Sequence, residues 1–300
     1  MHLLGNIGTF FLMMLSCVHI VCWAEETPDS GERAYADSRR LLSVGDFDGA
    51  VKSLQLALRH DFLNTKYSGD LRALQNIVKI RKECAQEKDF LRWNVLARQL
   101  RAYYQKNRVR NELVDISLQI FDHTKLTWDA VCVINAMILA ERFDDALDFA
   151  EAIDEQEANP SIQISKGYVL YAANRNVEAR KLARSISLDN LQTPDDLLRL
   201  ARLQAATELP ASSVKTLTRC FELTPLGRLP ELKEYIVKLP EFEPLLSSPE
   251  FAKAMTTQSG QTNIDRNCSI RWINVQFDQR PKYIRDLSKG PINPDDWKIK

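Results

Sequence analysis

Residues 141–153 read ERFDDALDFAEAI, and residues 174–186 read NRNVEARKLARSI. The two stretches share alanine at their sixth and tenth positions and isoleucine at their thirteenth. Their spacing gives a period of about 33 residues, which is typical of solenoids that stack pairs of antiparallel helices. Solenoids offer a long surface to a partner and need no catalytic pocket. The pattern therefore predicts an all-α solenoid whose role is binding.

The segment 31–64 carries the residues expected of one helix pair. Gly45-Asp46-Phe47 is followed by Ala50. Glycine ends the first helix, the aromatic residue wedges between the helices, and alanine lets them cross closely. This stretch therefore predicts a turn between two antiparallel helices.

Further helix pairs are placed along the chain as far as residue 227. They cover 74–107, 127–159, 160–193 and 194–227, with one additional helix at 108–126. Thr193-Pro194 predicts the start of the last pair, because a threonine N-cap is commonly followed by proline in the first turn. Two short capping helices are expected at 229–239 and 242–255, because a solenoid must cover its last apolar face.

These segments resemble tetratricopeptide repeats across most of 31–227. The family favours glycine where Gly167 stands, followed here by Leu170 and Tyr171, and it favours proline where Pro225 ends the last pair. The resemblance implies a right-handed superhelical solenoid of about five helix pairs. It would occupy 31–227 and be closed by capping helices in 228–256.

The resemblance also implies that the first helix of each pair lines a concave groove. The candidate contact residues at these positions are Trp128, Asn135, Tyr168, Tyr171, Arg199 and Arg202. Some family members grip a terminal carboxylate, but Val131 and Ser165 replace the lysine and asparagine of that clamp. We expect a protein or peptide partner, bound as an extended segment. The alternative for the two tyrosines is packing between neighbouring repeats.

The leader, 1–24, contains no Lys, Arg, Asp or Glu, and most of 7–21 is apolar. Cys22-Trp23-Ala24 offers small residues at the two positions that a signal peptidase reads. We therefore expect cleavage after Ala24, a short linker at 25–30, and a periplasmic or secreted protein. Because the leader lacks a basic start, the alternative is an uncleaved membrane anchor.

The last part of the chain, 257–300, begins with a polar run that is typical of linkers. Within it Ile273, Val275 and Phe277 alternate with polar residues, which predicts one strand-like stretch. We expect this tail to be partly disordered.

Charge is balanced overall, with 40 basic and 40 acidic residues, which argues against a nucleic-acid partner. It is segregated along the chain: 79–110 holds ten basic and three acidic residues, and 141–157 holds eight acidic and one basic. A solvated surface is the ordinary interpretation. The alternative is peripheral contact of the 79–110 segment with a membrane or an anionic glycan.

Residues that could carry chemistry are few after leader removal. His60 and His123 have no neighbouring nucleophile pattern, and the adjacent aspartates favour solvated or capping positions. The four remaining cysteines are interpreted as small buried hydrophobes rather than a disulfide framework: Cys84, Cys132, Cys220 and Cys268. We predict no enzyme, no cofactor and no metal. The main hypothesis is a scaffold or assembly factor of the cell envelope, and the alternative is an accessory or regulatory subunit of an envelope enzyme complex.

Overall fold

The computed structural model describes residues 30–156 and 159–261, which form helices and connecting turns with no β-strand among them. The chain divides into two compact units: the first ends at residue 76, and the second comprises 43–45 and the residues from 77 onward. The predicted all-α class is confirmed. The expected leader and the strand-like stretch of the tail lie outside the described residues.

The first unit contains α1 (Ser30–Ser43), α2 (Phe47–His60) and the beginning of α3 (Thr65–Gln86). Gly45 has a φ of 82°, a left-handed conformation that glycine adopts without strain. The Asp46 side chain then caps α2 by accepting a hydrogen bond from the Gly49 amide at 2.8 Å. The turn predicted at Gly45-Asp46-Phe47 is therefore confirmed.

Helix α3 begins at Thr65, well before the predicted start at 74. The Asn64 side chain accepts hydrogen bonds from the Lys66 and Tyr67 amides at 3.1 and 3.2 Å. Asparagine in this role satisfies amides that have no partner within the helix. Tyr67 and Leu74 are buried along the helix, so packing supports its early turns as well.

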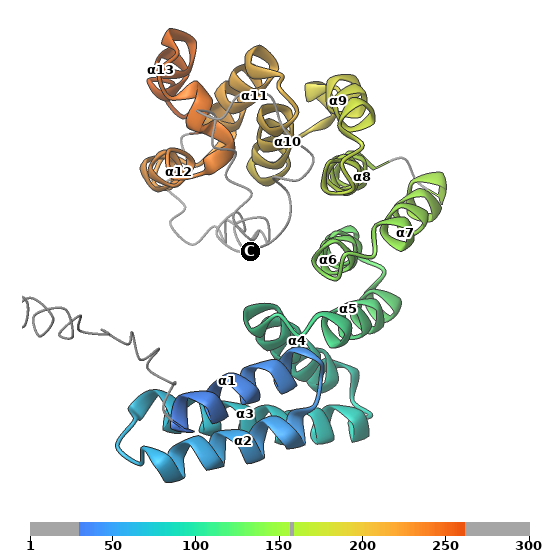
Figure 1. The fold of residues 1–300 in the computed structure, drawn as a ribbon. Helices are drawn as coiled ribbons and strands as arrows, with labels where there is room; N and C mark the ends of the chain where they lie inside the picture. The colour runs from blue at the N-terminus through green and yellow to red at the C-terminus, as the bar shows by residue number, and fades with distance from the viewer. Residues whose placement is uncertain (1–29, 157–158, 262–300) are drawn as a thin grey trace, which may run out of the picture. The chain divides into compact units, whose positions relative to one another are not determined.

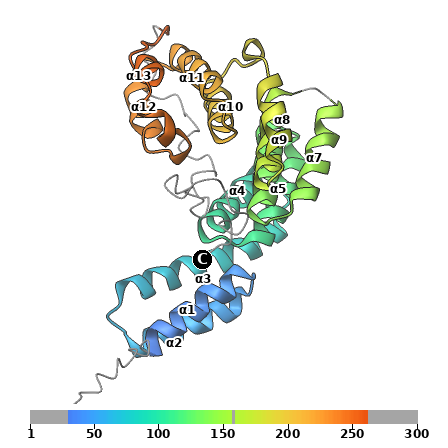
Figure 2. The ribbon, with the colours of Figure 1, turned by 45° about the horizontal axis from the view of Figure 1, so that its top comes forward.

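The second unit contains the rest of α3 and the elements that follow it, up to the last capping helix. The bounds up to the end of the stacked pairs are α4 (Phe90–Asn107), α5 (Arg110–Thr124), α6 (Thr127–Leu139), α7 (Phe143–Gln156), α8 (Pro160–Ala172), α9 (Asn176–Ser185), the 3-10 turn η1 (Leu188–Asn190), α10 (Pro194–Ala206) and α11 (Pro210–Leu223). Within this unit α6, α8 and α10 pack side by side as an inner layer, and α7, α9 and α11 pack outside them (Figures 1 and 2). This repeated stacking is the predicted helical solenoid.

One backbone conformation recurs at the turns of this solenoid. Four residues, one in each helix pair, have φ between 58° and 62°: Arg108, Glu141, Asn174 and Glu208. After each of them the next amide donates to the carbonyl five residues earlier, at 2.8 to 2.9 Å. This arrangement ends a helix by satisfying its last carbonyl groups. The repeat therefore runs through the pairs α4–α5, α6–α7, α8–α9 and α10–α11.

The recurring turn shows that the helices of two predicted segments pair differently from the prediction. The residue pattern predicts one helix pair within 74–107 and an additional helix at 108–126. The structure instead pairs α4 with α5 through the turn at Arg108, and α3 is the additional helix. Arginine takes the left-handed conformation here where glycine is the usual choice, so the residue type gave no sign of the turn.

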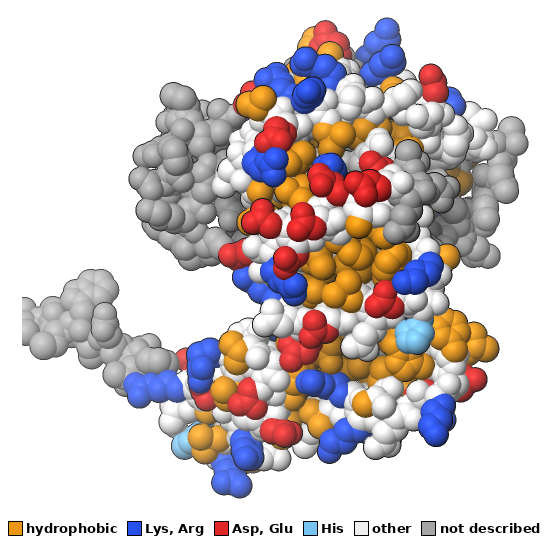
Figure 3. Space-filling view, turned by 90° about the vertical axis from the view of Figure 1, so that its right-hand side faces the viewer, with side chains coloured by type: hydrophobic (Ala, Val, Ile, Leu, Met, Phe, Trp, Pro, Cys, Tyr) orange, Lys and Arg blue, Asp and Glu red, His pale blue; other side chains and the backbone are white. Residues whose placement is uncertain are grey.

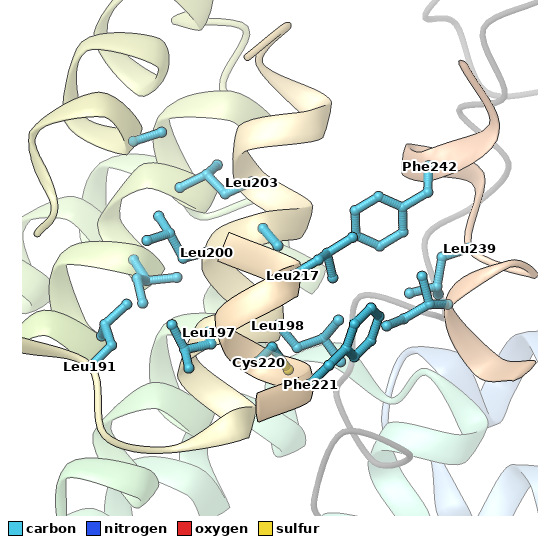
Figure 4. Packing of buried hydrophobic residues seen from close by; sticks show 14 of the residues in the cluster. Leu191, Leu197, Leu198, Leu200, Leu203, Leu217, Cys220, Phe221, Leu239 and Phe242 are labelled. Carbon is cyan, nitrogen blue, oxygen red and sulfur yellow. The ribbon is translucent and has the colours of Figure 1, made fainter. Parts of the chain in front are cut away.

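The capping region contains α12 (Leu229–Ile236), the 3-10 turn η2 (Pro240–Leu245) and α13 (Pro249–Met255). A single helix was expected at 242–255, but Pro244 and Pro249 lack the amide that continues a helix. Leu239 and Phe242 face Leu217 and Phe221 of α11 (Figure 4), and all four are buried. The last apolar surface of the repeats is therefore covered, as expected.

The three described cysteines, Cys84, Cys132 and Cys220, are buried free thiols, as interpreted from the sequence. Burial raises the pKa of Cys220 to about 12. Cys268 lies outside the described residues. Among 30–156 and 159–261, no helix has both the length and the apolar character needed to cross a membrane.

Candidate partner-binding surface

The inner layer repeats two sets of positions, once in each of its three helices. The first set is Cys132, Ser165 and Arg199, and the second set is Asn135, Tyr168 and Arg202. These six residues form the inner row. Each set takes one residue from α6, one from α8 and one from α10. All six side chains are at most 6% exposed. The inner row therefore places polar and charged groups within an otherwise apolar layer.

Polar contacts join α8 to α10 at the centre of the inner row. The Tyr168 hydroxyl donates to the backbone carbonyl of Arg199 at 2.8 Å. The Arg199 guanidinium donates to the Ser165 hydroxyl and, at 3.4 Å, to the Asp196 carboxylate. Ser161 donates to the same carboxylate at 2.7 Å. These bonds fix the spacing of the two helices, so the inner surface is rigid here.

Asp196 also belongs to the start of α10. Its amide donates to the Thr193 hydroxyl at 3.1 Å, which is the N-cap predicted from Thr193-Pro194. The Asp196 carboxylate lies in the first turn of α10 and accepts a hydrogen bond from the Thr193 hydroxyl at 2.9 Å, so this aspartate stands at a helix start as expected. The pair Asp295-Asp296 lies outside the described residues.

Arg202 connects the repeats to the cap. One of its terminal nitrogens lies 2.9 Å from a carboxylate oxygen of Glu241 in η2, and the two side chains are 1% and 9% exposed. A buried ion pair is costly to break by removing one partner, because the other charge stays buried. Arg202 therefore has a structural role in attaching the cap to α10.

A second buried ion cluster surrounds Asp129 at the start of α6. Both of its carboxylate oxygens accept from Arg98 at 2.8 and 2.9 Å, and Arg101 and Thr124 donate to them at 2.9 Å. Burial raises the pKa of Asp129, but the hydrogen bonds from Arg98, Arg101 and Thr124 outweigh it, so the pKa is lowered. This cluster could not be predicted from the sequence, because the arginines lie two helices before the aspartate.

Among the buried polar atoms of the inner row, the Oδ1 acceptor of Asn135 and the Nε donor of Arg199 have no hydrogen-bond partner among the described residues. A buried polar group without a hydrogen bond costs about 1–3 kcal/mol. A hydrogen-bond donor to Asn135 Oδ1 and an acceptor for Arg199 Nε would therefore each be stabilising.

The structure separates the six predicted contact residues into two groups. Trp128, near the start of α6, and Tyr171, near the end of α8, are half-buried. The other four, Asn135, Tyr168, Arg199 and Arg202, are buried. Tyr168 belongs to a hydrophobic cluster that includes residues of α10 and α11, and Tyr171 packs against the same cluster. Both tyrosines therefore pack between neighbouring repeats. Their role as partner contacts stays a prediction.

Half of the basic residues in 79–110 bind the protein's own carboxylates. The pairs are Lys79–Glu83, Arg92–Glu87, Arg98–Asp129, Arg101–Asp129 and Arg110–Glu141. In the same way Lys166 binds Glu151 of the acidic segment at 2.7 Å. Figure 3 accordingly shows positive and negative side chains intermixed on one face. Contact of this segment with a membrane or an anionic glycan stays a prediction.

The two histidines lie in unrelated surroundings. His60 Nδ1 lies 3.0 Å from the Ser30 hydroxyl. The His123 ring packs on Trp93 with 4.5 Å between centroids, next to Phe90. Within the described ranges, no three His, Cys, Asp or Glu side chains gather closely enough to hold a metal ion.

A hollow of about 750 Å³ lies between the α9–η1 segment and α11. Its lining contains Arg184, Lys215 and Arg219 together with Asp189 and Glu222. Arg219 and Glu222 lie 3.1 Å apart, so two of these charges satisfy each other. Mixed charge favours no particular class of ligand, and the inner row remains the stronger candidate.

Neither a protein-family model nor a curated protein sequence matches this chain. The resemblance to tetratricopeptide repeats therefore rests on the residue pattern quoted from the sequence and stays a prediction.

Proposed function

We propose that this protein is a non-catalytic scaffold of the tetratricopeptide type that binds a peptide or an extended protein segment along α6, α8 and α10. The observation that carries the proposal is the inner row, where Asn135 Oδ1 and Arg199 Nε are buried without partners among the described residues. An extended chain has free backbone amides and carbonyls, which complement such an acceptor and such a donor.

The surroundings of the inner row suit this mode of binding. Trp128 and Tyr171 are half-buried, so each keeps part of an aromatic surface for the partner's side chains. The hydrogen bonds of Tyr168 and Arg199 hold α8 and α10 together before any partner binds. A surface that is ordered in advance loses little entropy on binding.

The proposed location is the cell envelope, and it rests on the apolar leader at 1–24. The mass of the N-terminal peptide of the mature chain tests it. A chain that begins at Glu25 supports export and cleavage. A chain that keeps its leader and fractionates with membranes supports the anchored alternative.

Peptide selection tests the binding function. Peptides would be selected from a random display library on the full-length chain, and their dissociation constants measured by calorimetry. We expect Tyr171→Ala to weaken binding by about tenfold, because a truncated aromatic contact commonly costs more than about 1 kcal/mol.

The matched control is Val177→Ala on α9, because Val177 is 83% exposed in the outer layer. This variant should bind the selected peptides as the wild type does. The proposal is rejected if no peptide is selected, or if both variants bind equally well.

A further inference from the structure

The turn between α2 and α3 exposes two large apolar side chains in succession. Phe62 is 79% exposed and Leu63 is 75% exposed. Single apolar residues on a surface are ordinary, but contiguous apolar exposure marks a contact site. These two residues are called the apolar tip. Packing within the first unit gives no reason for their exposure, so the apolar tip is a candidate for contact with another surface.

Hydrogen bonds on both sides of the apolar tip hold the turn in shape. The Asp61 amide donates to the Ala57 carbonyl at 3.0 Å and ends α2. The Asn64 side chain donates to the Asp61 carboxylate at 3.0 Å, and the Asn64 amide donates to the Asp61 carbonyl at 3.3 Å. The polar residues that flank the tip therefore bind each other, and the tip is ordered before any contact forms.

The apolar tip stands at one end of the first unit. The Ser30 hydroxyl lies 3.0 Å from His60 Nδ1, so α1 begins where α2 ends. Figure 1 shows the α2–α3 turn beside the start of α1. The first turn of α1 adds Glu32 and Arg33, whose charges cancel. A turn at the end of helices projects, whereas sites for small ligands are concave, so the tip suits a larger surface.

Positive charge surrounds the apolar tip. Arg59 in the last turn of α2 and Lys66 in the first turn of α3 are exposed, and so is Lys52 further back on α2. The one acidic residue within 52–66 is Asp61, which is already bonded to Asn64. This segment therefore has more positive than negative charge, and it complements an anionic surface.

The shape of the apolar tip distinguishes between a protein and a membrane. Each partner in a stable protein complex buries about 800 Å², far more than two projecting side chains provide. A lipid interface needs no matching pocket, because apolar side chains can enter it at the boundary between headgroups and acyl chains. Anionic headgroups also attract Lys and Arg near the membrane surface. Apolar residues flanked by cations therefore fit a lipid surface better than a protein.

We propose that the apolar tip inserts into the interface of an anionic phospholipid membrane, with Arg59 and Lys66 beside the headgroups. This contact goes beyond the proposed peptide binding, because the tip belongs to the first unit and the inner row to the second. Phe62 and Leu63 supply the apolar contact, and the basic residues select anionic lipid. Each Lys or Arg near such a surface strengthens binding roughly fivefold.

Site-specific fluorescence of the full-length chain tests the proposal. A fluorescent amino acid whose emission depends on its surroundings would replace Leu63 in one variant. In a second variant it would replace Val44, which is 66% exposed and precedes the other end of α2. Vesicles of phosphatidylglycerol with phosphatidylcholine should shift the emission from position 63 to the blue and leave position 44 unchanged. Vesicles of phosphatidylcholine alone should bind at least about tenfold more weakly.

Charge variants of the chain labelled at position 63 provide a second measurement. Arg59→Gln with Lys66→Gln should weaken binding to the anionic vesicles at least about tenfold. The matched control is Lys181→Gln with Lys215→Gln, which removes the same charge from exposed positions of α9 and α11. This control should bind as the unchanged chain does. Because all four side chains are exposed, the variants should fold normally.

Several results would overturn the proposal. They are an unchanged emission at position 63, equal shifts at positions 63 and 44, equal affinity for the two kinds of vesicle, and equal binding by the two charge variants. A blue shift that grows with protein concentration in the absence of vesicles would assign the tip to a second copy of the chain and also overturn it. The leader at 1–24 is common to all variants, so differences between them report on the tip.

Discussion

At the scale of single residues, the protein depends on polar groups buried in an apolar helical layer. Asp129 is held by Arg98 and Arg101, and Arg202 is held by Glu241. Each carboxylate accepts hydrogen bonds from groups two or more helices away in sequence. Charged side chains of this kind are tolerated inside a protein only with well-placed partners.

Substitution of Asp129 tests the first cluster. Asp129→Asn should lower the free energy of unfolding by about 3 kcal/mol at pH 7, because it leaves two arginines without their carboxylate. The folded pKa of Asp129 is lowered, so its contribution is present above the ordinary carboxyl pKa of about 3.9 and is lost as the pH falls through the folded value. Urea unfolding at pH 7 and pH 3 should therefore show a smaller difference at the lower pH.

The control is Asp122→Asn, which removes an exposed pair with Lys125. Its effect should stay within about 0.5 kcal/mol at both values of pH. Equal losses for the two variants would contradict the account of Asp129.

A double-mutant cycle tests the pair that attaches the cap. Glu241→Ala alone should destabilise the protein strongly, by about 3–5 kcal/mol, because the Arg202 charge stays buried. Adding Arg202→Met should recover part of this loss, since the buried charge is then removed. Urea unfolding of the two single variants and the double variant measures the coupling. Additive losses would show that the pair is not coupled.

At the scale of elements, residue types predicted many helix ends and missed others. Thr193-Pro194 predicted the start of α10, and Gly45 predicted the turn before α2. The turn at Arg108 was missed because arginine takes the left-handed conformation there, where glycine is the usual residue. The break at Pro244 in the cap was also missed, because amphipathic spacing continued across it.

Glycine substitutions test how closely the inner helices pack. A methyl group at Gly167 on α8 would lie 2.5 Å from Leu203 Cδ2 on α10, so Gly167→Ala should cost about 1–3 kcal/mol through overpacking. Gly69→Ala on α3 is the matched control, because no atom lies within 4 Å of its new methyl group. This control should stabilise the protein by about 0.5–1 kcal/mol. Thermal unfolding of both variants checks the prediction, and a neutral Gly167→Ala contradicts it.

At the scale of the whole molecule, the described residues form two units that each pack around their own contacts. The sequence predicted one continuous array of repeats. Repeat spacing identifies local helix pairs, but it does not show where the contacts between neighbouring pairs become sparse. The positions of the inner row could be predicted from the period of the repeat. Its burial could not, because it depends on packing between residues far apart in the chain.

Hydrogen exchange tests this division. Stability in a stacked array is carried by contacts between neighbouring elements, so a local change should affect its own unit most. Gly167→Ala should speed amide exchange in α8 and α10 while leaving α1 and α2 unchanged. Mass spectrometry of exchanged peptides measures both units at once, and equal acceleration throughout would indicate a single cooperative unit.

Photo-crosslinking tests the central claim that the inner layer binds an extended segment. Benzoyl-phenylalanine would replace Tyr171 on α8 in one full-length variant and Val177 on α9 in another. We predict crosslinks from position 171 to an added selected peptide, and none from position 177. Crosslinks that form equally from both positions, or only from position 177, would contradict the claim.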